Sequence, residues 1–430
     1  MGFADHYLNN QSYLRSEMPA IPGEKAGIVI VIPCYNEDRL CDTLNSLWYC
    51  ERPESKAKVL IVVNSSASSS AEILKQNLKT IDDAKKWIAE HQDKKLSFTI
   101  IHKSSVPDKI AGAGFARKTG MDYATCIFNK LNNFSGIIVS LDADCTVEKN
   151  YLTAIENAYR HDKKVQCTTI YFEHPTEKSP GYEYEPDIYE AATQYELHLR
   201  YHIEFLRRIG FPYAYHTVGS AFSVNTSIYA DQGGMNSRKG GEDFYFLHKV
   251  FPVVKTIEIN DTKITPSPRP SSRVPFGTGP AIRKYINSNR KSLVTYNPSA
   301  YLELKELIML APQMYGSDKN QIHKMIKNLP SCMGSFMLSA DGPDKITEIN
   351  QNTASADSFI KRFFTWFNTF RAIKFLNYAH HSNYGYLPVI ETVIYLFDRM
   401  DVNYPDNYNN RELLAIIRDI QKNSNYISHL

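Results

Sequence analysis

The fold class is decided by the stretch IVIVI at residues 28–32 and by PCYNE at residues 33–37, which follows it. Five consecutive β-branched residues without a polar break are typical of a strand covered on both faces, as in a parallel sheet. Pro33 is expected to close this strand, because proline cannot donate a ladder hydrogen bond. A helix should follow over residues 37–50, where leucines recur at helical spacing.

The same alternation continues along the first half of the chain. Further strands are expected at residues 59–63, 97–102 and 136–141, with helical segments ending near Gln92 and covering residues 115–131. Strands separated by helices of this length form a parallel sheet with right-handed crossovers. The sequence therefore predicts an α/β fold in which helices flank a mostly parallel sheet.

After residue 144 strands and helices no longer alternate regularly. Strands are expected at residues 165–172 and 219–224, and helices at residues 187–209 and 244–251. Beyond about residue 285 the apolar pattern is mainly helical. The expected parts are an N-terminal arm (residues 1–26), an α/β domain (residues 27–285) and a helical C-terminal region (residues 286–430).

Composition and charge limit the classes of function. The 430 residues suggest two or three structural units, or one large domain with an addition. The net charge of +3 is too small to indicate nucleic acid or another polyanion as the main partner. No apolar stretch approaches the roughly 18 residues of a membrane span, and residues 1–20 lack the apolar core of a secretory signal. Seven scattered cysteines without zinc spacing favour reduced thiols in a cytoplasm.

Polar residues follow three of the expected strands, at the edge where open parallel sheets bind ligands. They are PCYNE at residues 33–37, Asn64-Ser65-Ser66, and Asp142-Ala143-Asp144. Two carboxylates two residues apart at a strand exit repel each other unless a hard divalent cation, such as Mg²⁺ or Mn²⁺, lies between them and holds a diphosphate. The alternative is a solvated turn. The position after a buried strand favours the cation site.

A second pair of carboxylates, Glu242 and Asp243, follows Gly240-Gly241. They stand in the first turn of an expected helix, where the helix dipole favours their ionised form. A carboxylate of this kind can accept a proton from a hydroxyl as a general base. The alternative interpretation is that both residues only cap the helix.

The order of these motifs resembles that of the family-2 glycosyltransferases. The resemblance covers residues 27–279 and implies a GT-A fold and sugar transfer from a nucleotide-sugar donor to a hydroxyl acceptor. The motifs that carry it are VIPCYNE at 31–37, GAGFARKTG at 112–120, LDAD at 141–144, GGM at 233–235 and GED at 241–243.

Roles follow from the resemblance, position by position. Asp144 would be the direct metal ligand and Asp142 would contact the ribose or the metal. Asp243 would be the catalytic base of an inverting transfer, and Glu242 would orient the acceptor or the site. Residues 219–221 resemble the strand on the acceptor side. The residues that would face the nucleotide or border the donor are Pro33, Tyr35, Glu37 and Arg117.

The sequence departs from the family pattern in two ways. Asn64 stands where the family usually has an acidic residue that reads the base, and its altered donor and acceptor groups leave uridine selectivity open. The QxxRW signature and the membrane spans of processive synthases are missing. The addition of one or a few sugars is therefore expected rather than a long polymer.

The segment at residues 265–279 is rich in proline, serine and glycine and cannot form regular structure. It resembles a loop of some relatives, in which Arg269 and Arg273 would close over the diphosphate and exclude water. A basic surface linker is the alternative.

Residues 359–376 combine phenylalanines and a tryptophan with four cations. Such a helix can lie on an anionic membrane surface and reach a lipid-linked acceptor, which would put the protein at the inner face of the membrane. A core helix of the C-terminal region with snorkelling cations is the favoured interpretation. The sequence leaves the oligomeric state open.

Two other functions remain open. A nucleotidyltransferase that forms sugar nucleotides can share the sheet and the carboxylates, but it would carry a glycine-rich basic loop where PCYNE stands. A non-catalytic sugar- or nucleotide-binding protein can share the scaffold. It is disfavoured because Asp142, Asp144, Glu242 and Asp243 are all present.

Overall fold

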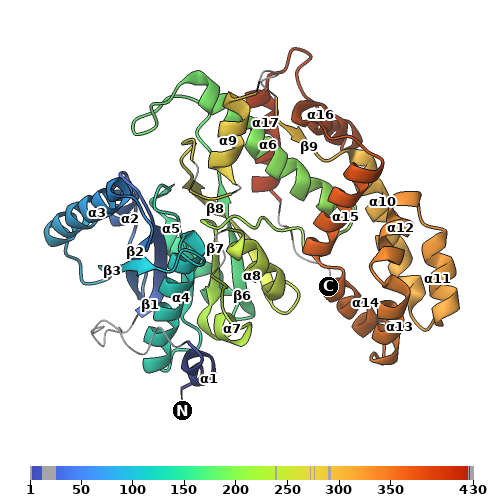
Figure 1. The fold of residues 1–430 in the computed structure, drawn as a ribbon, viewed down its shortest axis with the longest axis horizontal. Coiled ribbons are helices and arrows are strands. Elements are labelled where there is room, and N and C mark those ends of the chain that lie inside the picture. Colours follow the sequence, from blue (N-terminus) through green and yellow to red (C-terminus); the bar gives the residue numbers. More distant parts are fainter. Residues whose placement is uncertain are drawn as a thin grey trace. The chain divides into compact units, whose positions relative to one another are not determined.

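The computed structural model describes residues 2–11, 26–237, 240–271, 273–275, 277–288, 292–424 and 426. The chain forms two compact units (Figure 1). Unit 1 comprises residues 1–192 and 217–284, and unit 2 comprises residues 193–216 and 285–430. Residues 12–25 of the expected N-terminal arm lie outside the described residues, as do Ser272 and Phe276 of the expected loop.

Unit 1 alternates strands and helices along most of its length. Its elements are α1 (Asp5–Asn9), β1 (Ala26–Cys34), α2 (Leu40–Trp48), β2 (Lys56–Ser66), α3 (Ala71–Glu90), β3 (Leu96–Val106), α4 (Ala113–Lys130), β4 (Ile137–Ser140), β5 (Thr146–Val147), α5 (Tyr151–His161), β6 (Val165–Phe172), β7 (Phe222–Asn225), α7 (Thr226–Asp231), α8 (Glu242–Val250), β8 (Lys255–Thr265) and α9 (Thr278–Ile286). Helix α6 (Pro186–Arg208) begins in unit 1 and continues into unit 2.

One sheet of eight strands runs through unit 1, in the order β3-β2-β1-β4-β7-β6-β8-β5. The first four strands are mutually parallel. Strand β7 runs antiparallel to both β4 and β6, and β5 runs antiparallel to β8. The predicted α/β fold with a mostly parallel sheet flanked by helices is confirmed.

The central strand β1 is buried along nearly its whole length. Helix α4 packs closely against β1. A Cβ at Gly120 of this helix would lie 2.3 Å from Cγ1 of Val31 and 3.1 Å from Cγ2 of Val62. Only glycine allows this approach. The close packing fixes the N-terminal turns of α4 beside the carboxyl ends of β1 and β4, where the candidate site lies.

Strand β1 does not close at Pro33, as the sequence suggested, but continues to Cys34. Pro33 pairs with Val62 of β2, whereas β4 pairs with β1 only from Ile28 to Val31. From Pro33 onward β1 therefore has a sheet neighbour on one side only. The missing N–H of proline removes no ladder bond on the open side.

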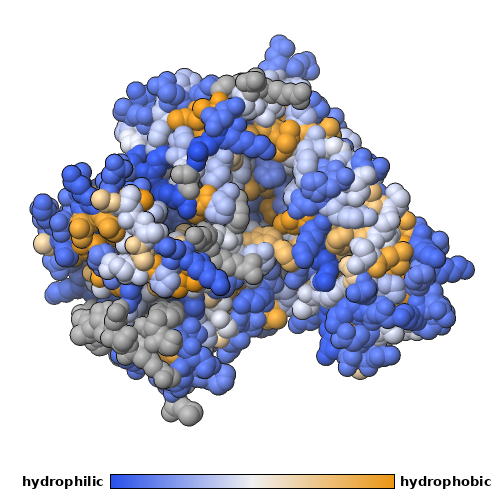
Figure 2. All heavy atoms as spheres, viewed as in Figure 1, coloured by the Kyte–Doolittle hydropathy of each residue, from blue (hydrophilic) through white to orange (hydrophobic). Residues whose placement is uncertain are grey.

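Unit 2 is mainly helical, as predicted for the C-terminal region. Besides the second half of α6, its elements are β9 (Val294–Thr295), α10 (Pro298–Leu310), η2 (Ala311–Met314), α11 (Lys319–Lys327), α12 (Ser331–Ser339), α13 (Gly342–Gln351), α14 (Ala356–Trp366), α15 (Thr369–Ser382), β10 (Leu387–Pro388), α16 (Val389–Arg399) and α17 (Asn410–Lys422). The surface of α11 and α13 is largely hydrophilic on the face drawn in Figure 2.

The expected helix at residues 359–376 is two helices. Helix α14 ends at Trp366, and α15 begins at Thr369 with the side chain of Asn368 accepting a hydrogen bond from the backbone N–H of Arg371. Five of the six phenylalanines at residues 359–376 form part of the core, whereas Phe370 is half-buried and the cations lie at or near the surface. The core residues are Phe359, Phe363, Phe364, Phe367 and Phe375.

In the described part of the chain, no helix combines the length and the apolar character that crossing a membrane requires.

Candidate active site

Arg117 lies at the centre of the site, on the second turn of α4, and its side chain is buried. Its Nε donates to Oε1 of Glu242 at 3.0 Å, and its Nη2 donates to Oδ1 of Asp142 at 3.0 Å. Its Nη1 donates to Oγ of Ser140 at 2.6 Å and to the carbonyl oxygen of Gly219 at 2.9 Å. One guanidinium therefore joins α4, β4, α8 and the segment before β7.

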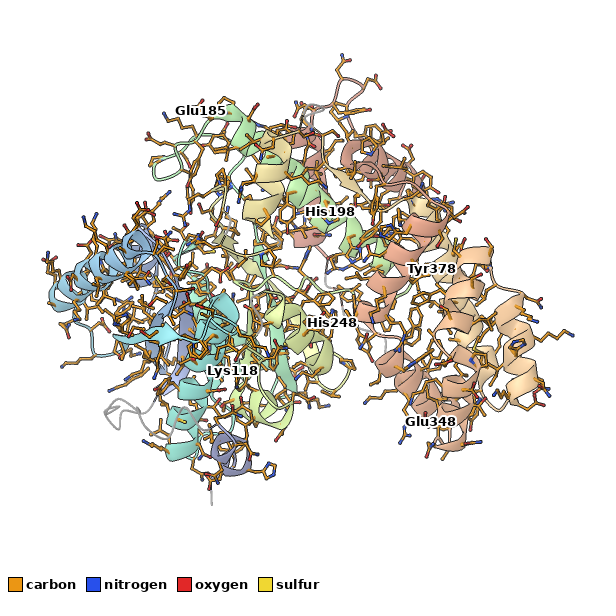
Figure 3. All side chains as sticks on the ribbon, in the orientation of Figure 1. Lys118, Glu185, His198, His248, Glu348 and Tyr378 are labelled. Carbon is orange, nitrogen blue, oxygen red and sulfur yellow. The ribbon has the colours of Figure 1, made fainter. Side chains whose placement is uncertain are left out.

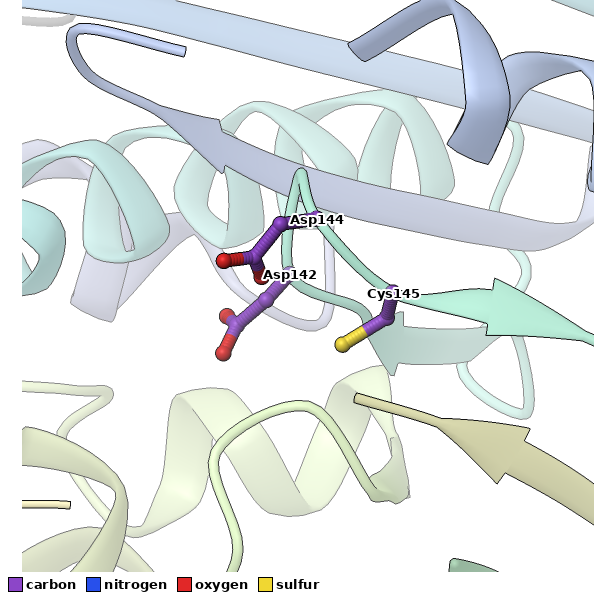
Figure 4. Close-up of side chains that lie close together, drawn as sticks. All are labelled: Asp142, Asp144 and Cys145. Atoms are coloured by element: carbon purple, nitrogen blue, oxygen red, sulfur yellow. The ribbon is translucent and has the colours of Figure 1, made fainter. Parts of the chain in front are cut away.

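The turn after β4 presents Asp142 and Asp144, with buried Ala143 between them. Figure 4 shows the two carboxylates side by side on this turn. Candidate ligand atoms of Asp142, Asp144 and Cys145 all lie within 4.8 Å of one another. Because β4 ends at Ser140, the turn stands at the carboxyl end of a buried parallel strand, which is where the sequence predicted a site.

Glu242 and Asp243 are the first two residues of α8, after Gly241 with a φ of 72°. Glu242 is buried against Arg117, and Asp243 is half-buried. A Cβ on Gly219 would lie 2.5 Å from Oδ2 of Asp243, so a larger residue at 219 would collide with this carboxylate. Asp243 thus lies beside the segment that also accepts hydrogen bonds from Arg117.

A second cluster of charges lies on the other side of the 142–144 turn. Oε2 of the buried Glu37 accepts from Nη2 of Arg269 at 2.6 Å and from Nη1 of Arg273 at 2.8 Å. Arg273 also donates to Oδ2 of Asp144 at 3.1 Å, and Nη2 of Arg269 lies 3.6 Å from the same oxygen. Arg269 pairs with Asp38 as well, at 2.9 Å. Both arginines of the 266–273 segment are therefore held by carboxylates of the site.

The loops after β1 and β2 are tied together by buried amides. Asn64 donates from Nδ2 to the carbonyl oxygen of Gly112 at 2.7 Å, and its Oδ1 is buried without a hydrogen-bond partner among the described residues. Asn77 of α3 donates to the carbonyl oxygen of Asn64 at 2.8 Å and accepts from the backbone N–H of Asn36 at 2.8 Å. The carbonyl oxygen of Tyr35 accepts from Nη1 of Arg273 at 3.1 Å.

Burial and mutual repulsion raise the pKa of two of these carboxyls. Burial raises the pKa of Asp144 to about 6, with Arg273 opposing and Glu37 adding to the rise. Burial, followed by the charge of Glu242, raises the pKa of Asp243 to about 7, against the opposing charge of Arg117. Each of the two has its own cationic neighbour, Arg273 for Asp144 and Arg117 for Asp243. Carboxyl groups with raised pKa values beside specific charge partners are typical of catalytic sites.

The sequence model of Glycosyl transferase family 2 matches residues 29–217, which include Arg117 and the 142–144 turn. This part of the chain is therefore a glycosyltransferase family 2 domain. No curated protein matches the chain significantly.

The solved structures that match this chain have low sequence identity and low TM-scores. Residues 1–349 of TarS from S. aureus are 12% identical at a TM-score of 0.38, with 79% of this chain and 92% of that chain covered. The mannosyltransferase PcManGT from Pyrobaculum calidifontis, in complex with GDP-Man and Mn²⁺, is 14% identical at a TM-score of 0.35, with 97% of this chain and 93% of that chain covered. At TM-scores this low, the likenesses say nothing of the donor or acceptor of the present chain.

The carboxylates of the family-2 domain fit a hard divalent cation. Asp142 and Asp144 offer oxygen ligands close together, and a cation such as Mg²⁺ commonly takes one or two carboxylates plus substrate phosphates. The third group nearby, the Cys145 thiol, is a soft ligand, and burial raises its pKa well above the usual range. The oxygen pair is therefore suited to Mg²⁺ or Mn²⁺, with Cys145 outside the ligand set.

Some residues of the site were not identified from the sequence. Ser140 is the one polar residue of β4, and its Oγ donates to the carbonyl oxygen of Gly219 at 2.6 Å. Its place just before LDAD in an apolar strand was the available signal. Asp38 and Asn77 gave no such signal, because each acquires its role from a partner distant in sequence.

Proposed function

We propose that this glycosyltransferase moves a sugar from a nucleoside-diphosphate sugar to a hydroxyl acceptor, with inversion and with a divalent cation. One observation carries the proposal: Asp142 of the 142–144 turn and Glu242 of the 242–243 pair both accept hydrogen bonds from Arg117, whose charge also acts on Asp243. Residues 100 positions apart supply acids that sugar transfer uses at two different places. A solvated turn or a helix cap alone gives no reason for such convergence.

Asp243 is the proposed base. Its carboxylate takes the proton of the acceptor hydroxyl while the acceptor oxygen bonds to the anomeric carbon and the bond from that carbon to the diphosphate breaks. Attack from the face opposite the leaving group inverts the configuration. A base whose pKa lies near 7 is well matched to this step at neutral pH. Glu242 and Arg117 position it and set its charge.

Asp144, with Asp142, is proposed to hold the divalent cation. When bound, the cation supplies positive charge that stabilises the leaving diphosphate. In the structure Arg273 and Arg269 pair with Asp144 and Glu37. We propose that they exchange these carboxylates for donor phosphate oxygens, which guanidinium groups bind in pairs. Arg269 and Arg273 would then cover the donor.

The nucleotide is proposed to lie along the loops after β1 and β2, beside Pro33, Tyr35 and Glu37. Asn64 donates its amide to Gly112, so its buried Oδ1 remains as the acceptor for a base N–H. The same proposal includes a reducing cytoplasmic location, transfer of one or a few sugars, and a glycan, lipid-linked or small-molecule acceptor.

The test separates binding from chemistry. A thermal-shift panel of UDP-, GDP- and dTDP-sugars, with and without Mn²⁺, should identify a donor, since a ligand at a hundred times its Kd adds about 2.7 kcal/mol of stability. With that donor, Asp243→Asn should bind in a Mn²⁺-dependent way and transfer or hydrolyse at least about a hundredfold more slowly.

The outcomes distinguish the alternatives. Equal turnover by Asp243→Asn would reject this residue as the base. No shift with any donor would count against the transferase, and a shift without transfer or hydrolysis by the parent would favour the non-catalytic binding protein. Formation of pyrophosphate from a nucleoside triphosphate and a sugar phosphate would favour the nucleotidyltransferase, which Cys34-Tyr35-Asn36-Glu37 disfavours because that loop is acidic and glycine-free.

A further inference from the structure

Unit 2 holds two tyrosine rings in fixed positions at its surface. Strands β9 and β10 pair antiparallel with Leu387 opposite Thr295, which brings Tyr386 and Tyr296 together at the end of the ribbon. Their ring centroids lie 5.9 Å apart. Both hydroxyls donate to Oδ1 of Asn377 on α15, at 3.2 Å from Tyr296 and 3.3 Å from Tyr386. One amide oxygen thus locks both rings.

A buried imidazole supports the pair from below. The ring of His380 stacks on Tyr386 with centroids 4.6 Å apart and lies 5.2 Å from Tyr296. Its Nε2 accepts from the backbone N–H of Asn297 at 2.6 Å, so its Nδ1 carries the proton and donates to the carbonyl oxygen of Leu376 at 2.6 Å. Burial lowers the pKa of His380, which keeps the ring neutral. Tyr386 is 41% exposed on this rigid support.

The surrounding sequence is free of acidic residues. Residues 358–390 contain no aspartate or glutamate, although the chain has 46 of them, and they contain four lysines or arginines. Lys374 is exposed on α15, three residues before Asn377 and so on the same side of the helix. This stretch of the sequence therefore has more cations than acids, although the structure brings Glu303 of α10 against the hydroxyl of Tyr384.

We propose that Tyr296, Tyr386, Asn377 and Lys374 form a binding surface for an anionic glycan. The face of the exposed Tyr386 ring suits the C–H groups of a pyranose. Nδ2 of Asn377 has no hydrogen-bond partner within the part of the chain that the structure describes, and it can donate to a sugar hydroxyl. Lys374 can pair with a carboxylate or phosphate on the glycan.

A membrane surface fits these residues less well. A helix that lies in a bilayer interface buries protruding apolar side chains. Among the described residues of α14 and α15, no large apolar side chain is strongly exposed. Trp366 is covered by Arg371, whose Cζ lies 4.4 Å from the ring centroid, and Phe370 by Lys374, whose Nζ lies 4.6 Å away. A glycan needs only one exposed, rigid ring with polar groups beside it.

The test measures binding of full-length protein, without donor or Mn²⁺, to a panel of anionic oligosaccharides containing uronate or phosphate groups. Maltohexaose serves as the neutral probe. We expect an anionic member to bind, and Tyr386→Ala, Lys374→Gln and Asn377→Asp each to weaken its affinity by about tenfold or more. Asn377→Asp keeps an acceptor for both tyrosine hydroxyls but replaces the free donor with a negative charge.

Tyr404→Ala and Lys319→Gln are the matched controls, since both residues lie in unit 2 outside the surface, and they should leave the affinity unchanged. Thermal unfolding checks that each variant folds. If Tyr386→Ala does not fold, Tyr386→Phe, which keeps the ring, is measured in its place. Absence of binding across the anionic panel, or equal binding by the three variants, would overturn the proposal. So would binding of phosphatidylglycerol vesicles or RNA in place of every glycan.

This inference rests on the proposed function only in that the glycan would be the acceptor. Failure of the proposed function can be recognised separately, because the donor thermal shift and the Asp243→Asn assay do not involve Tyr386, Asn377 or Lys374. A protein that binds an anionic glycan but no nucleotide sugar would keep the surface and lose the transferase. A protein that binds a nucleotide sugar but no anionic glycan would keep the transferase and lose the surface.

Discussion

Asp243 is the residue whose protonation should control the rate. Burial and the charge of Glu242 raise its pKa to about 7, so it is mostly protonated, and cannot act as a base, at pH 6. As the pH rises through 7 the proton is lost and activity appears. We expect kcat/KM to rise about tenfold per pH unit below this pKa and to level off above it. Initial rates of nucleoside-diphosphate release from pH 5 to 9 measure this.

The neighbouring carboxylate gives this prediction its control. Glu242→Gln removes a negative charge that raises the pKa of Asp243, so the ascending limb should move to lower pH. A profile that is flat between pH 5 and 8 would contradict the assignment of Asp243. A limb that moves to higher pH in Glu242→Gln would contradict the proposed electrostatic cause.

Arg273 and the proposed cation would compete for the same carboxylate oxygen. Arg273 donates to Oδ2 of Asp144 at 3.1 Å, and a bound cation would need the carboxylates of the 142–144 turn. We therefore expect Arg273→Gln to bind Mn²⁺ more tightly than the parent in the absence of donor, by about tenfold, or 1.4 kcal/mol. It should bind the nucleotide sugar more weakly. Electron paramagnetic resonance of free Mn²⁺ measures the first effect.

Arg160→Gln is the matched control for this prediction. Arg160 also lies in unit 1 and pairs with an acid, Glu54, but both are largely exposed and neither belongs to the site. Its loss should leave Mn²⁺ affinity unchanged. Equal Mn²⁺ affinity in Arg273→Gln and the parent would show that Arg273 does not compete with the cation.

At the scale of elements, the division between α14 and α15 depends on one cap. The side chain of Asn368 accepts from the backbone N–H of Arg371, which would otherwise have no partner within the helix. We expect Asn368→Ala to lower the free energy of unfolding by about 1 kcal/mol and Asn368→Asp to retain most of it. Thr365→Ala, on the exposed face of α14, is the control. Equal denaturant midpoints for the two alanine variants would contradict the role of the cap.

The elements also show what the sequence can and cannot predict. Strands β1 and β2 are visible as β-branched runs, and Asp142 and Asp144 stand out because both belong to one local motif. Asparagine is a common N-cap residue, so Asn368 could have marked a helix start, but the run of phenylalanines around it concealed the end of α14 and the start of α15. In each case the deciding information is local.

Long-range pairs could not be predicted in the same way. Arg117 was expected to border the donor, yet its contacts with Asp142 and Glu242 join residues 25 and 125 positions apart. Arg273 was expected to close on a diphosphate, and its pairing with Glu37, 236 positions away, depends on how the sheet brings its strand ends together. Residue type predicted the charge of these side chains, and only the fold determines their partners.

At the scale of the whole molecule, the two units are not separate along the chain. Residues 193–216 group with unit 2, although residues on both sides of them belong to unit 1. Within unit 2, the buried Glu196 accepts from Arg200 at 2.7 Å and from Arg418 of α17 at 2.8 Å. Arg200 also donates to Oε1 of Gln421 at 2.9 Å. The second half of α6 therefore depends on the last helix.

A chain cut after Lys284 would keep α6 but lose its partners. Glu196 and Arg200 would lose Arg418 and Gln421, and the buried rings of Tyr201 and Phe205, which pack on Tyr301, would become exposed to water. A newly exposed apolar face of this kind favours aggregation. We expect residues 1–284 to aggregate or to melt at a much lower temperature than the full chain. A chain ending at Tyr426 keeps α17 and should melt at the same temperature as the full chain. Differential scanning fluorimetry and soluble yield measure both. If residues 1–284 stay monomeric and melt at the same temperature as the full chain, unit 1 folds without unit 2, which would contradict this prediction.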